Sequence, residues 1–442
     1  MNALIQYLQG CGTARDVSMG IERAIHEGHL RPGEALPTIR ALAGQLGVNT
    51  ATVANAYRQL QARGLTYGDR RRGTRVNGTP AAFGPPPGHT GGLIDLASGN
   101  VDPALLPDLG SALAHRYQGT TSYTAVTLLP RLHEVASGQF RADGIATGRL
   151  AAVSGALDGI ERILNAHVNA GDRIALEEPC FSRTLDLVRS MNLTAEPVAC
   201  DQEGPLPESL AQALRRGARG LIVTPRAQNP TGSALTAERA ERIKDVLGEH
   251  PGTLLIEDDH AALVVDQPAI TLTGGWTGPW AVIRSYAKAL GPDLRVAVVT
   301  GDETTISRVE WRQRLGIGWV SHILQGAVAD LLVQPPVQRL LDRARRVYSE
   351  RRAFVIETLA EAGVTAHGRS GFNVWVPVRH ESDTVLALRE HGYAVLAGER
   401  FRLGGPPAIR VTTAALPTQD AARFTEALRS VLAATPGTGA TT

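Results

Sequence analysis

Residues 283–291, Ile-Arg-Ser-Tyr-Ala-Lys-Ala-Leu-Gly, place a lysine directly after an apolar run that begins at Ala281. The run has the character of a buried strand, so Lys288 should lie at the carboxyl end of a strand, where open α/β sheets bind their ligands. Lysine, unlike arginine, can form a Schiff base with an aldehyde, and a poorly solvated amine loses its proton more easily. The stretch therefore predicts an α/β fold with a nucleophilic amine at one edge of its sheet.

Lysine is rare in this chain, which makes Lys288 more informative. Lysine and arginine together number 45, and Lys244 and Lys288 are the two lysines among them. Lys244 lies in the charged stretch 241–245, which has the pattern of a solvated helix, so we interpret it as an ordinary surface residue. Lys288 has small and apolar neighbours instead, and this setting favours a chemical role.

From residue 93 onward, short apolar runs alternate with amphipathic stretches. Runs at 221–223, 254–256 and 296–299 have the length and composition of buried strands. Such alternation indicates an α/β domain with a largely parallel sheet. A chain of 442 residues, 43% of them apolar, is long enough for two or three domains with real cores.

Composition also excludes several classes of protein. No apolar run approaches the roughly 18 residues that a membrane helix needs, and the first residues show no basic segment before an apolar one. The three cysteines, Cys11, Cys180 and Cys200, have no CxxC spacing, which predicts neither a disulfide framework nor a structural zinc site. We therefore expect a soluble cytoplasmic protein that holds no metal and contacts no membrane.

The N-terminal residues differ from the rest in charge and in pattern. Residues 1–80 carry ten arginines and five acidic residues, whereas the whole chain has a net charge of +2. The pattern predicts five elements in order: a helix over 13–28, a second helix after Thr38, a tight turn at 47–49, a third helix that ends at Gly64, and a basic hairpin over 65–76. This order, together with the charge, predicts a winged helix-turn-helix that binds nucleic acid.

In this motif the helix after the tight turn presents its first residues to base edges in the major groove, and the wing reaches the phosphates or the minor groove. The side chains expected to face DNA are Asn49, Thr50, Thr52 and Asn55 at the bases, Thr38 and Arg40 at phosphates, and Arg70, Arg71, Arg72 and Arg75 on the wing. The alternative is a basic three-helix module that binds no DNA.

The stretch 28–40, Gly-His-Leu-Arg-Pro-Gly-Glu-Ala-Leu-Pro-Thr-Ile-Arg, with Leu-Gly-Val at 46–48 and Thr-Val at 52–53, closely resembles the GntR family of bacterial regulators. The resemblance covers most of residues 13–76 and implies binding to double-stranded promoter DNA. It departs at Thr50, where the family usually has an arginine, which leaves the base-reading chemistry at that position open. The Pro- and Gly-rich stretch 77–92 follows as a linker, so we expect domains at 1–76 and 93–442.

Three further features lie near strand ends or helix starts in the second domain. The acidic run 257–259, before His260, could pair with a protonated pyridine nitrogen, and a metal site is the weaker alternative there. Asn229 precedes a proline, which holds it extended, so its amide could bond a phenolic oxygen. The small-residue turn at 154–156 opens a helix and could hold a phosphate.

With Lys288, these features resemble the fold-type I aminotransferases, which depend on pyridoxal 5′-phosphate (PLP), over about residues 93–430. The resemblance implies a large α/β domain and a smaller C-terminal α+β subdomain. The roles it implies are an internal aldimine at Lys288, the pyridine nitrogen at Asp258, the ring oxygen at Asn229, the phosphate at Gly155, Ala156, Ser285 and Arg295, ring stacking at Phe181, a ligand carboxylate at Arg410, and the partner subunit's phosphate at Tyr123.

The sequence departs from that family at two places. Many relatives have a tyrosine where this chain has His260, and that tyrosine helps to tune the ring oxygen; a histidine can also donate a hydrogen bond but titrates nearer neutral pH. The segment after Tyr123 lacks the usual glycine. His260 is thus an expected cofactor contact with altered chemistry.

A GntR-like reader before an aminotransferase-like domain resembles the MocR subfamily of regulators, and within it the PtsJ-like members. That resemblance implies homodimers, often domain-swapped, which sense PLP, or an amino acid that attacks the PLP aldimine of Lys288, in vitamin B6 or amino-acid metabolism. One alternative is an active PLP-dependent aminotransferase that carries a reader. Another is a DNA-binding protein whose aminotransferase-like domain is an inert dimerisation scaffold.

Overall fold

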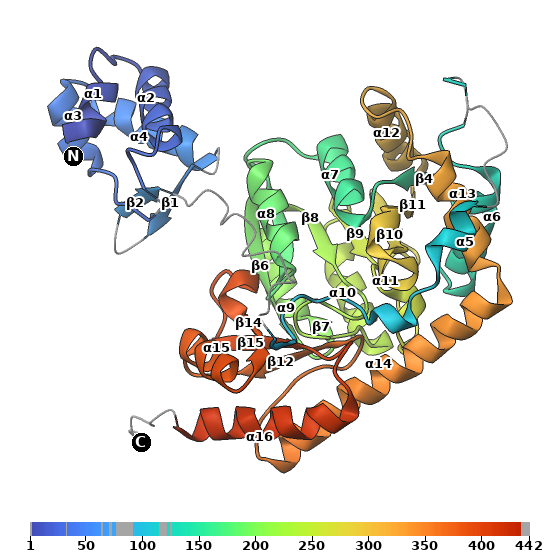
Figure 1. The fold of residues 1–442 in the computed structure, drawn as a ribbon. Helices are drawn as coiled ribbons and strands as arrows, with labels where there is room; N and C mark the ends of the chain where they lie inside the picture. Colours follow the sequence, from blue (N-terminus) through green and yellow to red (C-terminus); the bar gives the residue numbers. More distant parts are fainter. Residues whose placement is uncertain are drawn as a thin grey trace. The chain divides into compact units, whose positions relative to one another are not determined.

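The computed structural model describes residues 2–31, 33–62, 65–69, 73–76, 92–114, 122–123 and 126–434. The chain divides into two compact units (Figure 1). Residues 1–86 form most of the smaller unit, and most of the remaining residues form the larger one.

Short helices and a hairpin make up the smaller unit. Its elements are α1 (Asn2–Tyr7), α2 (Ala14–His26), α3 (Ile39–Leu46), α4 (Thr50–Ala62), β1 (Thr66–Asp69) and β2 (Gly73–Val76). The hairpin is antiparallel, with Thr66 opposite Val76. Helix α2 begins with a capping box formed by Thr13 and Asp16, and α3 ends at Gly47 in the left-handed conformation, with φ 67°. The predicted winged helix-turn-helix is confirmed, while α1 was not predicted.

The core of the smaller unit is made by the residues whose spacing predicts the helices, with one exception. Val17 and Ile21 of α2, and Val53 and Leu60 of α4, are fully buried. Ile39 shares the helical spacing of Leu42 and Leu46, which predicts an inward side chain, but it is 37% exposed. It is the first residue of α3, and Leu36 from the preceding segment is buried instead. Gly64 and the wing arginines Arg70, Arg71 and Arg72 lie outside the described residues.

An eight-stranded sheet forms the centre of the larger unit. In sheet order its strands are β4 (Arg149–Val153), β11 (Ala297–Gly301), β10 (Trp280–Ser285), β9 (Leu254–Asp258), β8 (Ala218–Val223), β5 (Arg173–Glu178), β6 (Thr194–Asp201) and β7 (Gly204–Pro205). Strands β10, β9, β8 and β5 are parallel, and β11 is antiparallel to both of its neighbours, β10 and β4. The carboxyl ends of β4, β10, β9, β8 and β5 therefore meet at one edge.

Helices cover this sheet (Figure 1). The helices of the larger unit are η1 (Pro103–Leu105), α5 (Leu109–Ala114), α6 (Pro130–Ala142), α7 (Ala156–His167), α8 (Ser182–Ser190), α9 (Pro207–Arg215), α10 (Ala237–Gly248), η2 (Ala262–Val264), α11 (Ala287–Leu290), η3 (Pro292–Leu294), α12 (Glu303–Arg314), α13 (His322–Leu332), α14 (Pro335–Glu361), α15 (Glu381–Glu390), η4 (Gly398–Phe401) and α16 (Thr418–Ala434). Helices α7 and α12 pack on each other and on β4. Residues of α6, α9, α10 and α13 join the core cluster that contains Val282 of β10.

A smaller subdomain follows the long helix α14. Its sheet has the order β12 (Asn373–Pro377), β15 (Ala408–Thr412) and β14 (Leu396–Ala397), and all of its pairs are antiparallel. Strand β3 (Ile94–Asp95), just after the predicted linker, pairs with β13 (Tyr393–Ala394) of this subdomain. The first residues of the second domain are thus held by its last part.

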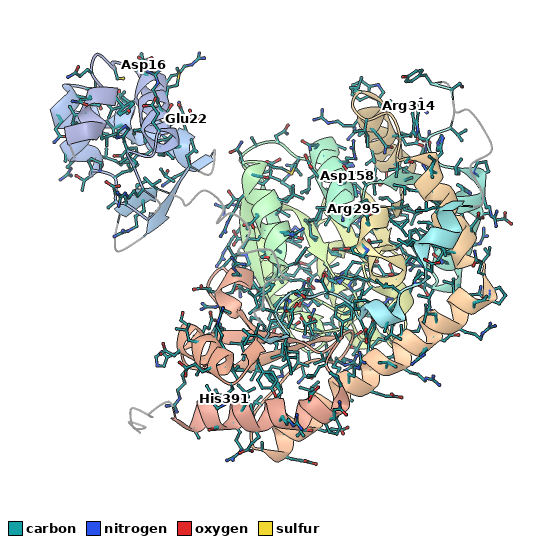
Figure 2. All side chains as sticks on the ribbon, viewed as in Figure 1. Asp16, Glu22, Asp158, Arg295, Arg314 and His391 are labelled. Carbon is teal, nitrogen blue, oxygen red and sulfur yellow. The ribbon has the colours of Figure 1, made fainter. Side chains whose placement is uncertain are left out.

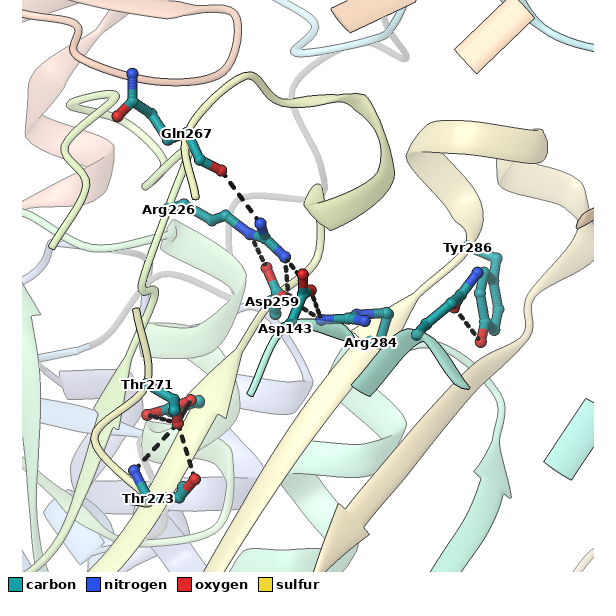
Figure 3. Close-up of polar contacts among 10 residues, drawn as sticks. Asp143, Arg226, Asp259, Gln267, Thr271, Thr273, Arg284 and Tyr286 are labelled. Atoms are coloured by element: carbon teal, nitrogen blue, oxygen red, sulfur yellow. Dashed lines mark hydrogen bonds and ion pairs between the residues drawn. The ribbon is translucent and has the colours of Figure 1, made fainter. Parts of the chain in front are cut away.

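Three buried charged side chains at the ends of β8, β9 and β10 form a network with the partly exposed Asp143, which follows α6 (Figure 3). Arg226 donates to both carboxylate oxygens of Asp259 at 2.8 and 2.9 Å, and Arg284 donates to Asp259 at 2.7 Å. Asp143 accepts from the same two arginines at 2.9 and 2.6 Å. Burial alone would raise the pKa of Asp259, but these hydrogen bonds and positive charges outweigh it and lower that pKa to about 2.

We expect Asp259→Asn to lower the free energy of unfolding of the larger unit by about 3–5 kcal/mol, because it leaves two buried guanidinium groups with one carboxylate between them. All five tryptophans lie in this unit, so urea unfolding followed by tryptophan fluorescence reports on it alone. Glu241→Gln is the matched control. It breaks an exposed pair with Lys244, 2.9 Å long, and should cost less than about 1 kcal/mol.

The same experiment repeated in acid checks the cause. A carboxyl whose pKa is lowered on folding stabilises the protein above its ordinary pKa of 3.8, and this stability is lost as the pH falls toward 2. Asp259→Asn should therefore lose less stability over that range than the wild type. Equal stability of variant and wild type at neutral pH would show that the network does not hold the three strand ends.

Candidate functional site

The carboxyl edge of the sheet carries most of the predicted cofactor residues. Asp258 ends β9, Ser285 ends β10, and Lys288 follows in α11. Asn229 comes from the segment after β8, and Gly155 comes directly after β4 and before α7. Residues that are up to 133 positions apart in the sequence thus share one edge, because parallel strands end on the same side.

Lys288 points its amine at the backbone of a distant segment. The Nζ atom donates to the carbonyl of Gly99 at 2.7 Å and lies 5.5 Å from the centre of the Phe372 ring. Burial, followed by the positive charges of Arg410 and Arg183, lowers the pKa of this amine from 10.5 to about 8. About one tenth of the amine is then neutral at pH 7, so Lys288 has the character of a nucleophile.

Asp258 is a buried carboxylate that needs a donor. It is 7% exposed, and its Oδ1 atom has no hydrogen-bond partner among the described residues. Burial, and then the negative charge of Asp259, raises its pKa to about 7. A buried acceptor without a partner is costly, and a protonated ring nitrogen would satisfy it.

His260 lies beside Asp258. Its Nδ1 atom is 4.0 Å from Oδ2 of Asp258. Burial, and then the positive charge of Lys288, lowers the pKa of the imidazole to about 4. The imidazole is therefore neutral at physiological pH, and one of its ring nitrogens is available as a hydrogen-bond donor.

An anion cradle forms where β4 meets α7. Gly155 caps α7 with φ 96°, and Ala156 begins the helix. Arg295, in the left-handed region with φ 47°, donates to the carbonyl of Ser154 at 3.0 Å, and Asp158 accepts from the Ser154 amide (Figure 2). A Cβ atom on Gly155 would lie 2.8 Å from Nη2 of Arg295, and the φ of 96° favours glycine at this position. A helix N-terminus beside an exposed guanidinium suits a phosphate.

Arg410, on β15, is buried and held from several sides. Its Nη1 atom donates to Oδ1 of Asn229 at 3.1 Å, and Nη2 donates to the carbonyl of Ala97. The guanidinium lies 5.0 Å from the centre of the Phe401 ring, and its Nε atom has no hydrogen-bond partner among the described residues. Burial lowers the pKa of Arg410 to about 10, so it remains a cation at neutral pH.

The segment 97–99 is the part of the site that sequence reasoning missed. Ala97 and Gly99 offer their carbonyls to Arg410 and Lys288. Gly99 has φ 70°, and a Cβ atom there would lie 3.3 Å from both terminal nitrogens of Arg410. The one local signal was a glycine in a short irregular stretch after the linker. Every residue has a backbone carbonyl, so the residue types of this segment do not indicate which carbonyls bind Lys288 and Arg410. The contact therefore could not be predicted from the sequence.

Phe181, predicted to stack on the ring, and Tyr123, predicted to reach the partner subunit's phosphate, lie in different surroundings. Phe181 is half-buried against the cluster of Trp375, Phe401 and Ala408. Tyr123 is 95% exposed, and its ring centre lies 5.9 Å from that of Trp319.

In the smaller unit, several of the predicted DNA contacts have structural roles. Thr38 accepts from the amide of Ala41 and caps α3, and Asn49 accepts from the amide of Ala51 at 2.8 Å and caps α4. Arg75 donates to the carbonyl of Gly33 at 2.6 Å, which ties the wing to the turn before α3. Arg40 and Thr50 are exposed, while Thr52 is half-buried.

The described residues contain no group of three or more histidine, cysteine or acidic side chains placed to hold a metal ion. No helix within the described ranges is both long and apolar enough to cross a membrane.

Two family models match the chain, one for each unit. "Bacterial regulatory proteins, gntR family" matches residues 13–76, and "Aminotransferase class I and II" matches residues 92–428. Solved structures agree on the fold of the second region. The chain resembles the α-aminoadipate aminotransferase LysN from Thermus thermophilus, with a TM-score of 0.69 and 21% identity over 77% of this chain and 92% of that one. It also resembles the kynurenine aminotransferase of Pyrococcus horikoshii, with a TM-score of 0.70 and 18% identity over 77% and 91%.

Among the curated relatives, the match to PtsJ is long enough to span both regions. The vitamin B6 salvage pathway transcriptional repressor PtsJ of Salmonella typhimurium is 38% identical over 408 residues, which are 91% of this chain and 95% of that protein. The pyridoxine biosynthesis regulator PdxR of Corynebacterium glutamicum is 28% identical over 77% of each chain. With a GntR reader, an aminotransferase-like domain and this degree of identity to PtsJ, the chain belongs to the MocR subfamily of GntR-type transcriptional regulators.

Proposed function

We propose that this protein regulates transcription by binding promoter DNA through residues 1–76 and sensing PLP or an amino acid through residues 93–442, joined by the linker 77–92. The main observation behind the proposal is that Lys288 and Arg410 both donate hydrogen bonds to one backbone segment, 97–99. This segment follows the linker in the sequence. The similarity to PtsJ and PdxR supports a role in vitamin B6 metabolism.

The residues at the sheet edge fit PLP. The unpartnered Oδ1 of Asp258 suits a protonated pyridine nitrogen, and the cradle of Gly155, Ala156, Ser285 and Arg295 suits a phosphate. Asn229 and His260 could hold the ring oxygen, while Phe181 would stack on the ring. When bound, PLP supplies an aldehyde for the Lys288 amine and a ring that accepts electrons.

The contacts of segment 97–99 suggest how a ligand would be sensed. A ligand carboxylate that binds Arg410 must compete with the carbonyl of Ala97 and the amide oxygen of Asn229. A group that bonds to the Lys288 amine must likewise displace the carbonyl of Gly99. A ligand with different affinities for the two arrangements of this segment would shift the equilibrium between DNA-binding states.

Exposed apolar side chains support a homodimer. Tyr123, Val126, Trp311, Leu315 and Ile317 are each more than half exposed, and Tyr123 contacts Trp319. Large apolar side chains gathered in this way favour association with a second copy. The family resemblance further implies that the DNA-binding domains are swapped between subunits. Because its DNA ligand is chromosomal, we place the protein in the cytoplasm.

The second candidate function is an active aminotransferase. It is favoured by the complete set of Lys288, Asp258, Asn229 and Arg410 at the sheet edge. The two functions differ in turnover, because a regulator should complete at most a half-reaction with an amino acid. Sustained turnover with an amino donor and a keto acid would favour the enzyme.

We expect Lys288→Ala to abolish the visible absorption band that PLP shows when it is bound through a lysine, and to abolish any effect of PLP on DNA affinity. The physical reason is that alanine has no amine to bond the aldehyde. Absorption spectra and DNA titrations of the same samples measure both. Lys244→Ala is the matched control and should behave as the wild type, since Lys244 makes an exposed pair with Glu241. An effect of PLP on DNA affinity that persists in Lys288→Ala would show that sensing does not require the Schiff base. DNA binding by the wild type that responds neither to PLP nor to amino acids would favour an inert scaffold.

Titration of the full-length protein against DNA from upstream of its own gene, with and without PLP at one fixed salt concentration, tests the whole proposal. We expect the affinity or the footprint to change with PLP. Equal binding in both states would indicate an amino acid as the signal. The absence of specific binding in both states would favour the aminotransferase.

Substitutions at Arg410 distinguish the two effectors. If an amino acid is sensed, Arg410→Lys should weaken its effect on the spectrum of bound PLP by roughly 30-fold or more, because a buried charge pair contributes about 2–5 kcal/mol and lysine lacks the planar fork. The PLP content of the variant serves as its folding control. If the amino-acid titration of the variant matches that of the wild type, Arg410 does not bind the ligand carboxylate.

A further inference from the structure

The exposed face of α4 has an unusual composition for a helix that reads DNA. Positions 50, 51, 54, 55 and 58 fall on one side of a helix with 3.6 residues per turn. The opposite side is anchored in the core through Val53, Ala56, Tyr57 and Leu60, all buried. The outward side carries Thr50, Ala51, Ala54, Asn55 and Arg58.

The first two turns of this face carry no cation. Residues 50–57 contain neither lysine nor arginine, and Arg58 begins the third turn. The guanidinium of Arg58 donates to Oδ1 of Asn55, one turn earlier. Arg58 therefore orients the Asn55 amide and occupies one lone pair of Oδ1, which leaves the second lone pair and the NH2 group for a base edge.

The position of α4 relative to the rest of the smaller unit is well defined. The hydroxyl of Tyr57 donates to the carbonyl of Pro37 at 2.7 Å, and Ser18 of α2 donates to Gln59 at 3.0 Å. The Oδ1 atom of Asn49 caps the first turn. Within the first two turns of α4, the exposed side chains are two groups with methyls, Thr50 and Ala51, and one amide, Asn55.

These groups differ in the bases they suit. Guanine is read most often by arginine or lysine at O6 and N7, and neither occurs in the base-facing turns. Thymine offers a methyl group that packs on threonine or alanine, and adenine offers the donor and acceptor pair that matches an asparagine amide. Arg40, exposed on α3, supplies the charge that phosphates require.

We propose that α4 selects A·T base pairs in the major groove, with Thr50 and Ala51 on thymine methyls and Asn55 on adenine. The inference rests on the proposed function, because it requires that residues 1–76 bind DNA. It adds the chemical class of the base pairs at the centre of each half-site. Arg58 acts in this reading as a positioning residue for Asn55.

Selection of duplexes from a random DNA library by the full-length protein, with and without PLP, tests the inference. We expect A·T pairs at the positions that α4 contacts. Replacing each selected thymine by deoxyuridine should weaken binding about 4-fold per methyl that contacts Thr50 or Ala51. Selected G·C pairs at these positions, or no effect of deoxyuridine, would overturn the inference.

Two variants and a control connect the preference to the residues. Asn55→Ala, which suits the helix, should reduce the preference for adenine by roughly 5- to 150-fold. Thr50→Arg should shift the selected base at its position toward guanine. Arg40→Ala is the control, because losing a phosphate contact should weaken all sequences alike.

The outcomes separate this inference from the proposed function. If the wild type selects a sequence and Asn55→Ala selects the same one with equal preference, the proposed regulatory function is supported. The proposed selection of A·T pairs by α4 is then wrong. If the wild type selects no sequence in either PLP state, the proposed function fails and the inference fails with it.

Discussion

The site depends on the ion pairs that the carboxylate of Asp259 forms with two arginines. This carboxylate joins Arg226 and Arg284 in bonds of 2.7–2.9 Å, and each of the three residues lies next to a different functional side chain. Arg226 comes three residues before Asn229, Asp259 stands between Asp258 and His260, and Arg284 precedes Ser285. One buried ion network therefore fixes the segments that present the ring and phosphate contacts. Buried pairs of this kind are worth most as determinants of geometry, since their desolvation offsets much of their attraction.

The charge balance around segment 97–99 shows what the site can bind. Lys288 and Arg410 approach it together, and burial and mutual repulsion lower the pKa of Lys288. The groups that compensate these cations are the carbonyls of Ala97 and Gly99, the amide oxygen of Asn229 and, for Arg410, the negative charge of Asp95. Carbonyl dipoles compensate a cation less well than a carboxylate does, so an anionic ligand would find favourable partners here.

The two units of the chain divide the chemistry between them. In the smaller unit, three side chains predicted to contact DNA, Thr38, Asn49 and Arg75, cap helices or hold a turn. Our proposal assigns base recognition to a few exposed side chains of α4. In the larger unit, nearly every functional group sits at the end of a strand. The residues that we propose for DNA and for the effector are therefore separate sets, one in each unit.

The sequence by itself determined the winged helix-turn-helix, the alternation of strands and helices, and the placement of Lys288 and Asp258 at strand ends. These features follow from local periodicity, capping residues and turn residues, which act over a few positions. The tertiary structure alone decided that Arg226 and Arg284 both bind Asp259 and Asp143. It also decided that the carbonyls of Gly99 and Ala97 accept from Lys288 and Arg410, and that Ile39 is exposed. Such contacts join residues up to 313 positions apart, many of them through backbone atoms. No local pattern specifies those partners, because packing of the whole chain brings them together.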